Sequence, residues 1–151
     1  MFMCGDRNGK FMTENLLKPS VSVRSVICGP ADNVLILQRK SDNEWELPGG
    51  RLSSYEGVSE GLQREVREET SLSIDIEDIL LANSWVNEQD NDRFGVYYVS
   101  STEQRSVRLS EEHADFEWTN SPEAACRLPT AQAKAVQLSR GERTAKPVLD
   151  I

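Results

Sequence analysis

The hydrophobic positions in the first third of the chain fall into short runs separated by turn-forming residues. In residues 20–28, Val21 and Val23 alternate with polar side chains, which is typical of a half-buried strand. Turn-forming residues at 29–33 separate this run from the compact apolar stretch 34–39. The pattern therefore predicts two strands that pair as a hairpin.

The remainder of the chain alternates between helical and extended patterns. Apolar positions recur with a helical period over residues 57–70. The later elements are expected as strands at 73–86, 93–101 and 116–120, a helix with Ser121 as N-cap and Pro122 as first helical residue, and a C-terminal helix at 129–141. Because strands and helices alternate irregularly, the sequence predicts an α/β fold in which helices flank a mixed β-sheet.

The length of 151 residues fits a single domain. We expect an N-terminal arm at 1–19, the folded domain at 20–141 and a C-terminal tail at 142–151. The N-terminus lacks the apolar run of a signal peptide, and no stretch has the length of a membrane span. A cytoplasmic protein with no membrane partner is therefore expected.

The composition argues against several kinds of partner and metal site. A formal net charge of −8 provides no general attraction to polyanions, so duplex nucleic acid is not an expected partner. The chain has one histidine and three cysteines without CxxC spacing, which argues against a His-rich metal site, a zinc cluster or a disulfide framework. A small phosphorylated ligand stays compatible with the charge, because a divalent cation can bridge phosphate to acidic side chains.

Like charges crowd one side of the predicted helix at 57–70. Glu65, Glu68 and Glu69 fall within an arc of about 100° around the helix axis, beside the apolar stripe formed by Leu62 and Val66. Like-charge neighbours at this spacing repel, and partial burial beside apolar side chains increases the cost. Two interpretations stay open: a solvated charged surface, or a site for a divalent cation such as magnesium, which prefers oxygen ligands.

The stretch from Gly50 to Leu72 resembles the Nudix box, whose pattern is G-x5-E-x7-R-E-U-x-E-E-x-G-U with U a bulky aliphatic residue. The matching positions are Gly50, Glu56, Arg64, Glu65, Val66, Glu68, Glu69 and Leu72. Ser71 stands where the family has glycine. That glycine lies where the helix ends, so a left-handed serine in its place is expected to cost about 1 kcal/mol in backbone strain.

The resemblance implies the Nudix α/β/α sandwich and hydrolysis of a nucleoside diphosphate linked to another group, with Mg²⁺ or Mn²⁺ as cofactor. By the same resemblance, Glu68 and Glu69 would be metal ligands, and Glu65 a further ligand or the base that deprotonates water. Glu56 would be an outer or alternative ligand. Arg64 would orient the glutamates through salt bridges.

The resemblance extends to residues outside the helix. Gly49 would offer its backbone carbonyl to the metal. The segment around Glu112 resembles the part of MutT-type members that supplies another glutamate six residues before a tryptophan, here Trp118. Glu112 is therefore expected as a further ligand or catalytic acid, with an exposed loop acid as the alternative.

Three more residues are expected to bind substrate. Arg39 and Lys40 lie at the end of the second predicted strand, where similar proteins place basic residues that hold a phosphate. Gln132 falls where MutT-type proteins place an amide that reads the base, and an amide both donates and accepts hydrogen bonds. Exposed surface residues are the alternative interpretation at all three positions.

Substrate and assembly stay open between several alternatives. A nucleoside triphosphate, cleaved to monophosphate and pyrophosphate, is the favoured substrate of the expected enzyme. The alternatives are a nucleotide-sugar hydrolase, because residues 47–51 and the segment around Glu112 also resemble GDP-mannose hydrolases, and a Nudix domain that senses a nucleotide without cleaving it. The net charge of −8 argues against a capped-RNA processing enzyme. A homodimer is one option for the assembly.

Overall fold

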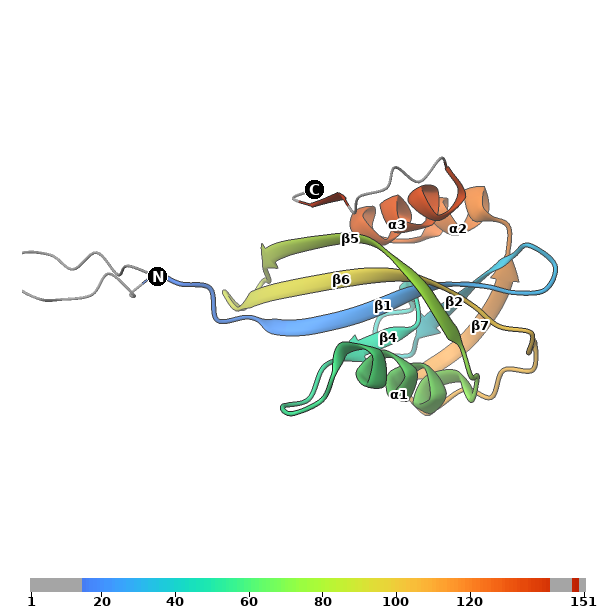
Figure 1. Cartoon of the computed structure of the whole chain (residues 1–151), viewed down its shortest axis with the longest axis horizontal. Coiled ribbons are helices and arrows are strands. Elements are labelled where there is room, and N and C mark those ends of the chain that lie inside the picture. The colour runs from blue at the N-terminus through green and yellow to red at the C-terminus, as the bar shows by residue number, and fades with distance from the viewer. Residues whose placement is uncertain (1–14, 142–147, 150–151) are drawn as a thin grey trace, which may run out of the picture.

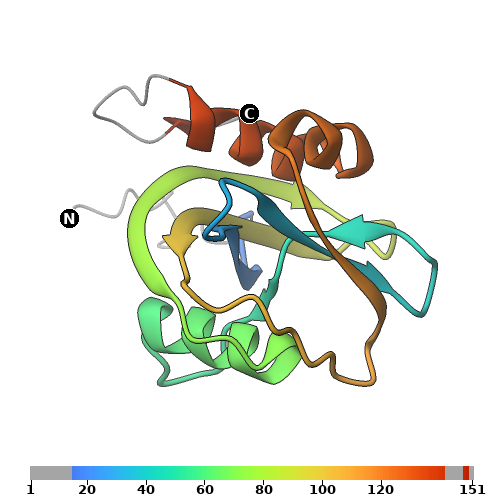
Figure 2. The same ribbon diagram turned by 90° about the vertical axis from the view of Figure 1, so that its right-hand side faces the viewer.

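The computed structural model describes residues 15–141 and 148–149. Its core is one mixed β-sheet with helices on both faces (Figure 1). The helix α1 (Val58–Thr70) covers one face, and the helices α2 (Ser121–Arg127) and α3 (Thr130–Arg140) cover the other. The view turned by 90° shows the same layers, with the sheet between α1 and the α2–α3 pair (Figure 2). The predicted α/β architecture with a mixed sheet and flanking helices is confirmed.

The sheet runs in the order β3-β2-β1-β6-β5-β8, with β4 added to β1 and β7 added to β2. The strand bounds are β1 Ser20–Cys28, β2 Val34–Arg39, β3 Trp45–Glu46, β4 Gly49–Arg51, β5 Asp75–Val86, β6 Asp92–Ser101, β7 His113–Thr119 and β8 Val148–Leu149. The long β1–β6 pair is parallel, and β5–β6 is antiparallel. Parallel pairing places segments about 70 residues apart side by side, which no local pattern predicts.

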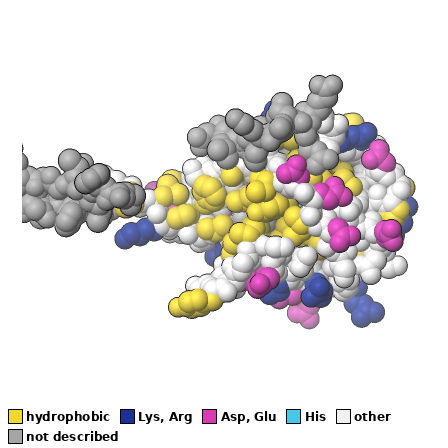
Figure 3. Space-filling view, in the orientation of Figure 1, with side chains coloured by type: hydrophobic (Ala, Val, Ile, Leu, Met, Phe, Trp, Pro, Cys, Tyr) yellow, Lys and Arg dark blue, Asp and Glu magenta, His cyan; other side chains and the backbone are white. Residues whose placement is uncertain are grey.

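Each face of the sheet builds its own hydrophobic core. Successive residues of a strand point to opposite faces, so Val26 and Ile36 pack towards α3, whereas Ile27 and Leu37 pack towards α1. This explains why β2 is a continuous apolar run, since its first four residues are all buried. The space-filling view shows further apolar side chains gathered over β5, β6 and β1 (Figure 3).

The end of α1 shows how the chain accommodates its departure from the family pattern. Ser71 adopts a left-handed conformation (φ 64°, ψ 14°), and its N–H donates to the carbonyl of Arg67. The left-handed C-cap expected at this position is therefore present, formed by a residue whose Cβ makes that conformation unfavourable.

The predicted hairpin of β1 and β2 is confirmed, since the two strands are joined by the expected turn and pair antiparallel at Cys28 and Val34. Beyond this pair, β4 and β6 flank β1, and β7 pairs with β2. Two other details of the expected elements are wrong. The N-cap of α2 is Asn120 rather than Ser121, since the Asn120 side chain accepts from the N–H of Glu123. The last large strand, β7, begins earlier than expected, at His113.

The two expected terminal segments are described only in part. Residues 1–14 of the expected arm and residues 142–147 and 150–151 of the expected tail lie outside the described residues. Within that tail, Val148–Leu149 form β8, which pairs in parallel with β5 at the edge of the sheet. Of the helices in the described ranges, none has the length and apolar character needed to cross a membrane.

Candidate metal and active site

The short strand β4 begins with Gly49 and Gly50, whose backbone lies directly against Glu69 and Glu65 of α1. Gly49 has φ 146°, and a Cβ there would lie 2.1 Å from the carbonyl oxygen of Val23. A Cβ on Gly50 would lie 2.4 Å from the carboxylate of Glu65. Only glycine fits at these two positions, because the first needs a rarely adopted backbone conformation and the second needs close approach of a side chain.

Glu69 is the most enclosed of the three clustered glutamates. It is 4% exposed, and its Oε1 accepts from the N–H of Gly49 at 2.7 Å. Burial raises the pKa of Glu69 to about 7, against the favourable effects of the Gly49 N–H and of Arg24. The expectation that the acidic arc borders the apolar stripe is therefore confirmed at this residue.

Arg64 connects the other acidic side chains of the helix. Its guanidinium contacts Glu56 at 2.9 Å, Glu65 at 3.0 Å and Glu68 at 3.2 Å. These ion pairs hold the pKa of Glu56 at about 2, whereas burial raises the pKa of Glu65. The salt bridges expected of Arg64 are present, and its orienting role stays a prediction. Glu56 is engaged by Arg64 and by the N–H of Ser53, so here it supports the arginine.

A pocket opens between α1 and the loop that precedes β7. Its volume is about 420 Å³, and its lining residues are Glu65, Glu68, Glu69, Ser110, Glu111 and Glu112. Glu112 is exposed at the rim, and its carbonyl oxygen accepts from the N–H of Lys40 at 3.0 Å. The structure therefore brings Glu112 to the three helix glutamates, from a segment more than 40 residues further along the chain. Glu111 lines the same pocket and was not singled out from the sequence.

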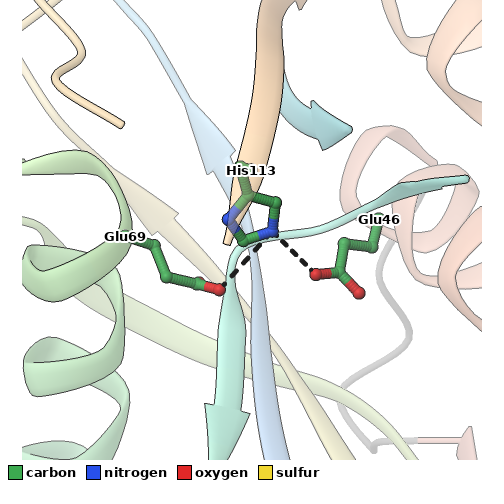
Figure 4. A group of neighbouring side chains, drawn as sticks. All are labelled: Glu46, Glu69 and His113. Atoms are coloured by element: carbon green, nitrogen blue, oxygen red, sulfur yellow. Dashed lines mark hydrogen bonds and ion pairs between the residues drawn. The ribbon is translucent and has the colours of Figure 1, made fainter. Parts of the chain in front are cut away.

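A buried histidine lies behind the pocket, between two carboxylates (Figure 4). His113 Nε2 is 2.9 Å from Glu46 Oε1 and 3.7 Å from Glu69 Oε2. All three side chains are buried, and their donor atoms lie within 4.8 Å of one another, so they could also hold a metal ion. The Nδ1 atom of His113 is buried without a hydrogen-bond partner among the described residues.

Sequence reasoning missed both His113 and Glu46. A lone histidine argued against a His-rich site but did not exclude a single histidine beside carboxylates. The alternation in β3 was the available indication, because Trp45 and Leu47 share one face and so place Glu46 on the other. Glu46 is 4% exposed and lies within 3.0 Å of Arg39 and 3.3 Å of Arg24.

Of the three expected substrate-binding residues, two are already engaged within the protein. The Arg39 guanidinium donates to both carboxylate oxygens of Asp42, at 3.0 and 2.7 Å, and contacts Glu46 as well. Gln132 is buried rather than exposed, because its Oε1 accepts from the N–H of Leu47 at 2.7 Å. Lys40 is exposed at the end of β2, beside Glu112.

The chemistry of the pocket lining suits a divalent cation. Five of its residues, Glu65, Glu68, Glu69, Glu111 and Glu112, carry carboxylate oxygens, which are the ligands that magnesium prefers. Among the described residues, the group whose ligand atoms already lie within 4.8 Å of one another is Glu46, Glu69 and His113. Burial raises the pKa values of Glu65 and Glu69 and so disfavours their charged forms in the metal-free protein. A bound cation would supply that compensation.

Comparisons with known proteins agree with this geometry. A family model described as the NUDIX domain matches residues 18–140. The chain is 37% identical over 60 residues to a MutT-like protein of Streptomyces ambofaciens, covering 40% of this chain and 39% of that protein. It is 29% identical over 110 residues to an octanoyltransferase of Myxococcus xanthus, covering 67% of this chain and 30% of that protein. The chain thus spans less than half the length of the curated relatives it matches.

Solved structures share the same architecture. The MutT protein from Methanosarcina mazei superimposes with a TM-score of 0.72 at 25% identity, covering 85% of this chain and 99% of that one. The Escherichia coli dihydroneopterin triphosphate pyrophosphohydrolase superimposes with a TM-score of 0.71 at 20% identity, covering 81% and 95%. With the family model spanning most of the chain and the carboxylate pocket in place, the chain belongs to the Nudix hydrolase family.

Proposed function

We propose that this protein hydrolyses a pyrophosphate linkage in a nucleoside diphosphate derivative, with Mg²⁺ or Mn²⁺ as cofactor. The observation that carries this proposal is the pocket of about 420 Å³ whose wall is formed by Glu65, Glu68, Glu69 and Glu112. Phosphoryl transfer depends mainly on positioning and charge neutralisation, which a carboxylate-held cation can provide. No nucleophilic side chain is needed in such a site.

Different residues of the site would bind the cation, orient its ligands and accept a proton. Glu68, Glu69 and Glu112 would hold the cation, which when bound neutralises phosphate charge and lowers the pKa of an attached water. Arg64 holds Glu65 and Glu68 in place through its ion pairs. Glu65 can accept a proton from the attacking water, since burial raises its pKa and makes it a stronger base than a solvated carboxylate.

The favoured substrate is a nucleoside triphosphate, cleaved to monophosphate and pyrophosphate. Two fold neighbours bear names that mention polyphosphate substrates: the dihydroneopterin triphosphate pyrophosphohydrolase, and an Ap4A hydrolase from Caenorhabditis elegans with a TM-score of 0.70 at 18% identity. At these identities the similarity establishes the fold alone, so the substrate rests on the site. A cytoplasmic location agrees with a small nucleotide as substrate and belongs to the same proposal.

A substrate panel in ¹⁸O-labelled water tests the proposal. Canonical and oxidised nucleoside triphosphates are incubated beside nucleotide sugars with Mg²⁺, and the products are identified by mass spectrometry. Label in the monophosphate or the pyrophosphate from a triphosphate is the expected result. Label confined to a released sugar would instead favour the nucleotide-sugar alternative. Binding of nucleotides without turnover of any panel member would identify a sensing domain and refute hydrolysis.

A further inference from the structure

Three arginines gather on the α3-facing side of the sheet. Arg24 lies on β1, where Ser22 is paired with Arg51 of β4 and Ser20 is paired with Arg93 of β6. Alternate residues of a strand share a face, and directly paired residues of neighbouring strands do so too. Arg24, Arg51 and Arg93 therefore project from the same face of three adjacent strands.

This positive cluster lacks matching negative charge. Arg24 is paired with Glu46, but within residues 15–141 neither Arg51 nor Arg93 forms an ion pair with a carboxylate. Arg93 is half-buried, and its pKa is lowered first by burial and then by repulsion from Arg51 and Arg24. Arg51 is exposed and Arg93 is half-buried, so both guanidinium groups are accessible to an anionic ligand.

The arginine cluster adjoins the candidate metal site. Arg51 directly follows Gly50, whose backbone packs against the Glu65 carboxylate, and the carbonyl oxygen of Arg51 accepts from Arg64 at 3.3 Å. Because residues alternate along β4, the Arg51 side chain points away from the glutamates, across the strand. A phosphate chain held at the carboxylate pocket could therefore continue around β4 to the arginines.

An aromatic side chain completes this face. Trp85 of β5 is paired with Arg93 of β6 and is 39% exposed. Its ring covers Gly95, where an added Cβ would lie 3.2 Å from Trp85 Cζ3 and 3.2 Å from Asn83 Oδ1. The Asn83 oxygen is buried and has no hydrogen-bond partner in the described part of the chain. The exposed flat face of the Trp85 ring suits a nucleobase, which can stack on an aromatic side chain.

We propose that Arg51 and Arg93 bind a phosphate group of the substrate beyond the pyrophosphate at the metal site, and that Trp85 stacks on its base. Guanidinium groups match phosphate oxygens in a bidentate geometry and stay charged. A hexose would offer no charge to these two arginines, whereas a third phosphate does. The inference rests on the proposed function and assigns a nucleoside triphosphate or longer polyphosphate as the substrate class.

Binding in EDTA isolates the arginines from the metal. Binding of ATP and of inorganic tripolyphosphate is measured by calorimetric titration. Arg51→Gln and Arg93→Gln should each lower the affinity for both ligands about tenfold. Arg67→Gln is the matched control. It removes the same charge as the test variants, but Arg67 lies on the side of α1 opposite Glu65. Arg93→Lys, which keeps the charge, should fall between wild type and Arg93→Gln. Unchanged tripolyphosphate binding in folded Arg51→Gln and Arg93→Gln proteins would overturn the proposal.

Substitution of Trp85 tests the proposed stacking of the base. Trp85→Leu should weaken the binding of ATP about fivefold or more and leave the binding of tripolyphosphate unchanged. Trp45→Leu should change the binding of neither ligand. Equal weakening of both ligands by Trp85→Leu would remove the stacking role.

Turnover separates this inference from the proposed function. Arginine-dependent binding in EDTA without hydrolysis in Mg²⁺ would refute the enzyme and keep the anion site. Hydrolysis of triphosphates with kinetics unchanged in Arg51→Gln and Arg93→Gln would keep the enzyme and refute the site. The expected result is a higher KM for triphosphates in both variants, with the affinity for Mg²⁺ alone preserved.

Discussion

At the scale of single residues, the clustered glutamates differ in their surroundings more than in their spacing. Glu69 is buried and held by the Gly49 N–H, Glu65 packs against Gly50 and Arg64, and the Glu68 side chain is 59% exposed. The same side-chain type therefore occupies three electrostatic environments within five positions of one helix. Under the proposed function, one carboxylate would bind the cation while another would accept a proton.

We expect Glu68→Gln and Glu69→Gln each to lower kcat by about 10²–10³, since each removes a charge that stabilises the transition state through the cation. Steady-state kinetics at saturating Mg²⁺ measure this effect. Glu60→Gln is the control, because Glu60 lies outside the acidic arc on the same helix. Similar kinetics in all three variants would contradict the geometric argument.

His113 is expected to position Glu69 for the cation. His113→Gln keeps an N–H donor at about the reach of Nε2, whereas the shorter side chain of His113→Asn does not. We therefore expect Mg²⁺ affinity, measured by calorimetry without substrate, to fall several-fold in His113→Asn and to be largely retained in His113→Gln. Equal losses in both variants, with equal melting temperatures, would refute the positioning role.

At the scale of elements, the C-terminal end of α1 is suboptimal. The left-handed conformation of Ser71 is one that glycine adopts without strain. Ser71→Gly should therefore raise the free energy of unfolding by about 1 kcal/mol. The same substitution in the first turn of the helix, Ser59→Gly, should instead lower it by roughly 0.5 kcal/mol, because glycine loses more backbone freedom on folding. Chemical denaturation measures both values, and a destabilising Ser71→Gly would contradict the strain argument.

At the scale of the whole molecule, the helix and the sheet together create a buried negative charge. Burial raises the pKa of Glu69 from 4.5 to about 7. The Gly49 N–H, Arg24 and His113 favour the charged form of Glu69, whereas Glu46 disfavours it, and together they do not offset the burial. The folded metal-free protein thus binds a proton more tightly than the unfolded chain. Its stability should fall as pH rises from about 4.5 to 7, by on the order of 2–3 kcal/mol.

Melting curves in EDTA across this pH range measure the effect. Mg²⁺ should restore stability at pH 7, because it binds the folded carboxylate site and not the unfolded chain. Glu69→Gln should flatten the pH dependence in EDTA and reduce the Mg²⁺ shift. A metal-free protein whose stability rises between pH 5 and 7 would show that Glu69 is not the dominant buried charge.

The sequence alone determined the features that depend on local spacing. A helical period places Glu65, Glu68 and Glu69 in one arc, and the resemblance over Gly50–Leu72 predicts that they bind a divalent cation. Most elements are also local, so their bounds follow from alternation, turn-forming residues and caps. The left-handed end of α1 at Ser71 could be predicted for the same reason.

Only the tertiary structure decided which distant segments meet. The contact between Glu46 and His113 joins positions 67 residues apart, and the arginine cluster depends on β1 pairing with both β4 and β6. Neither partnership leaves a periodic trace, because strand pairing is set by packing and hydrogen bonding between remote segments. Gln132 illustrates the same limit: its helix position is local, but its burial results from a bond to the N–H of Leu47, 85 residues away.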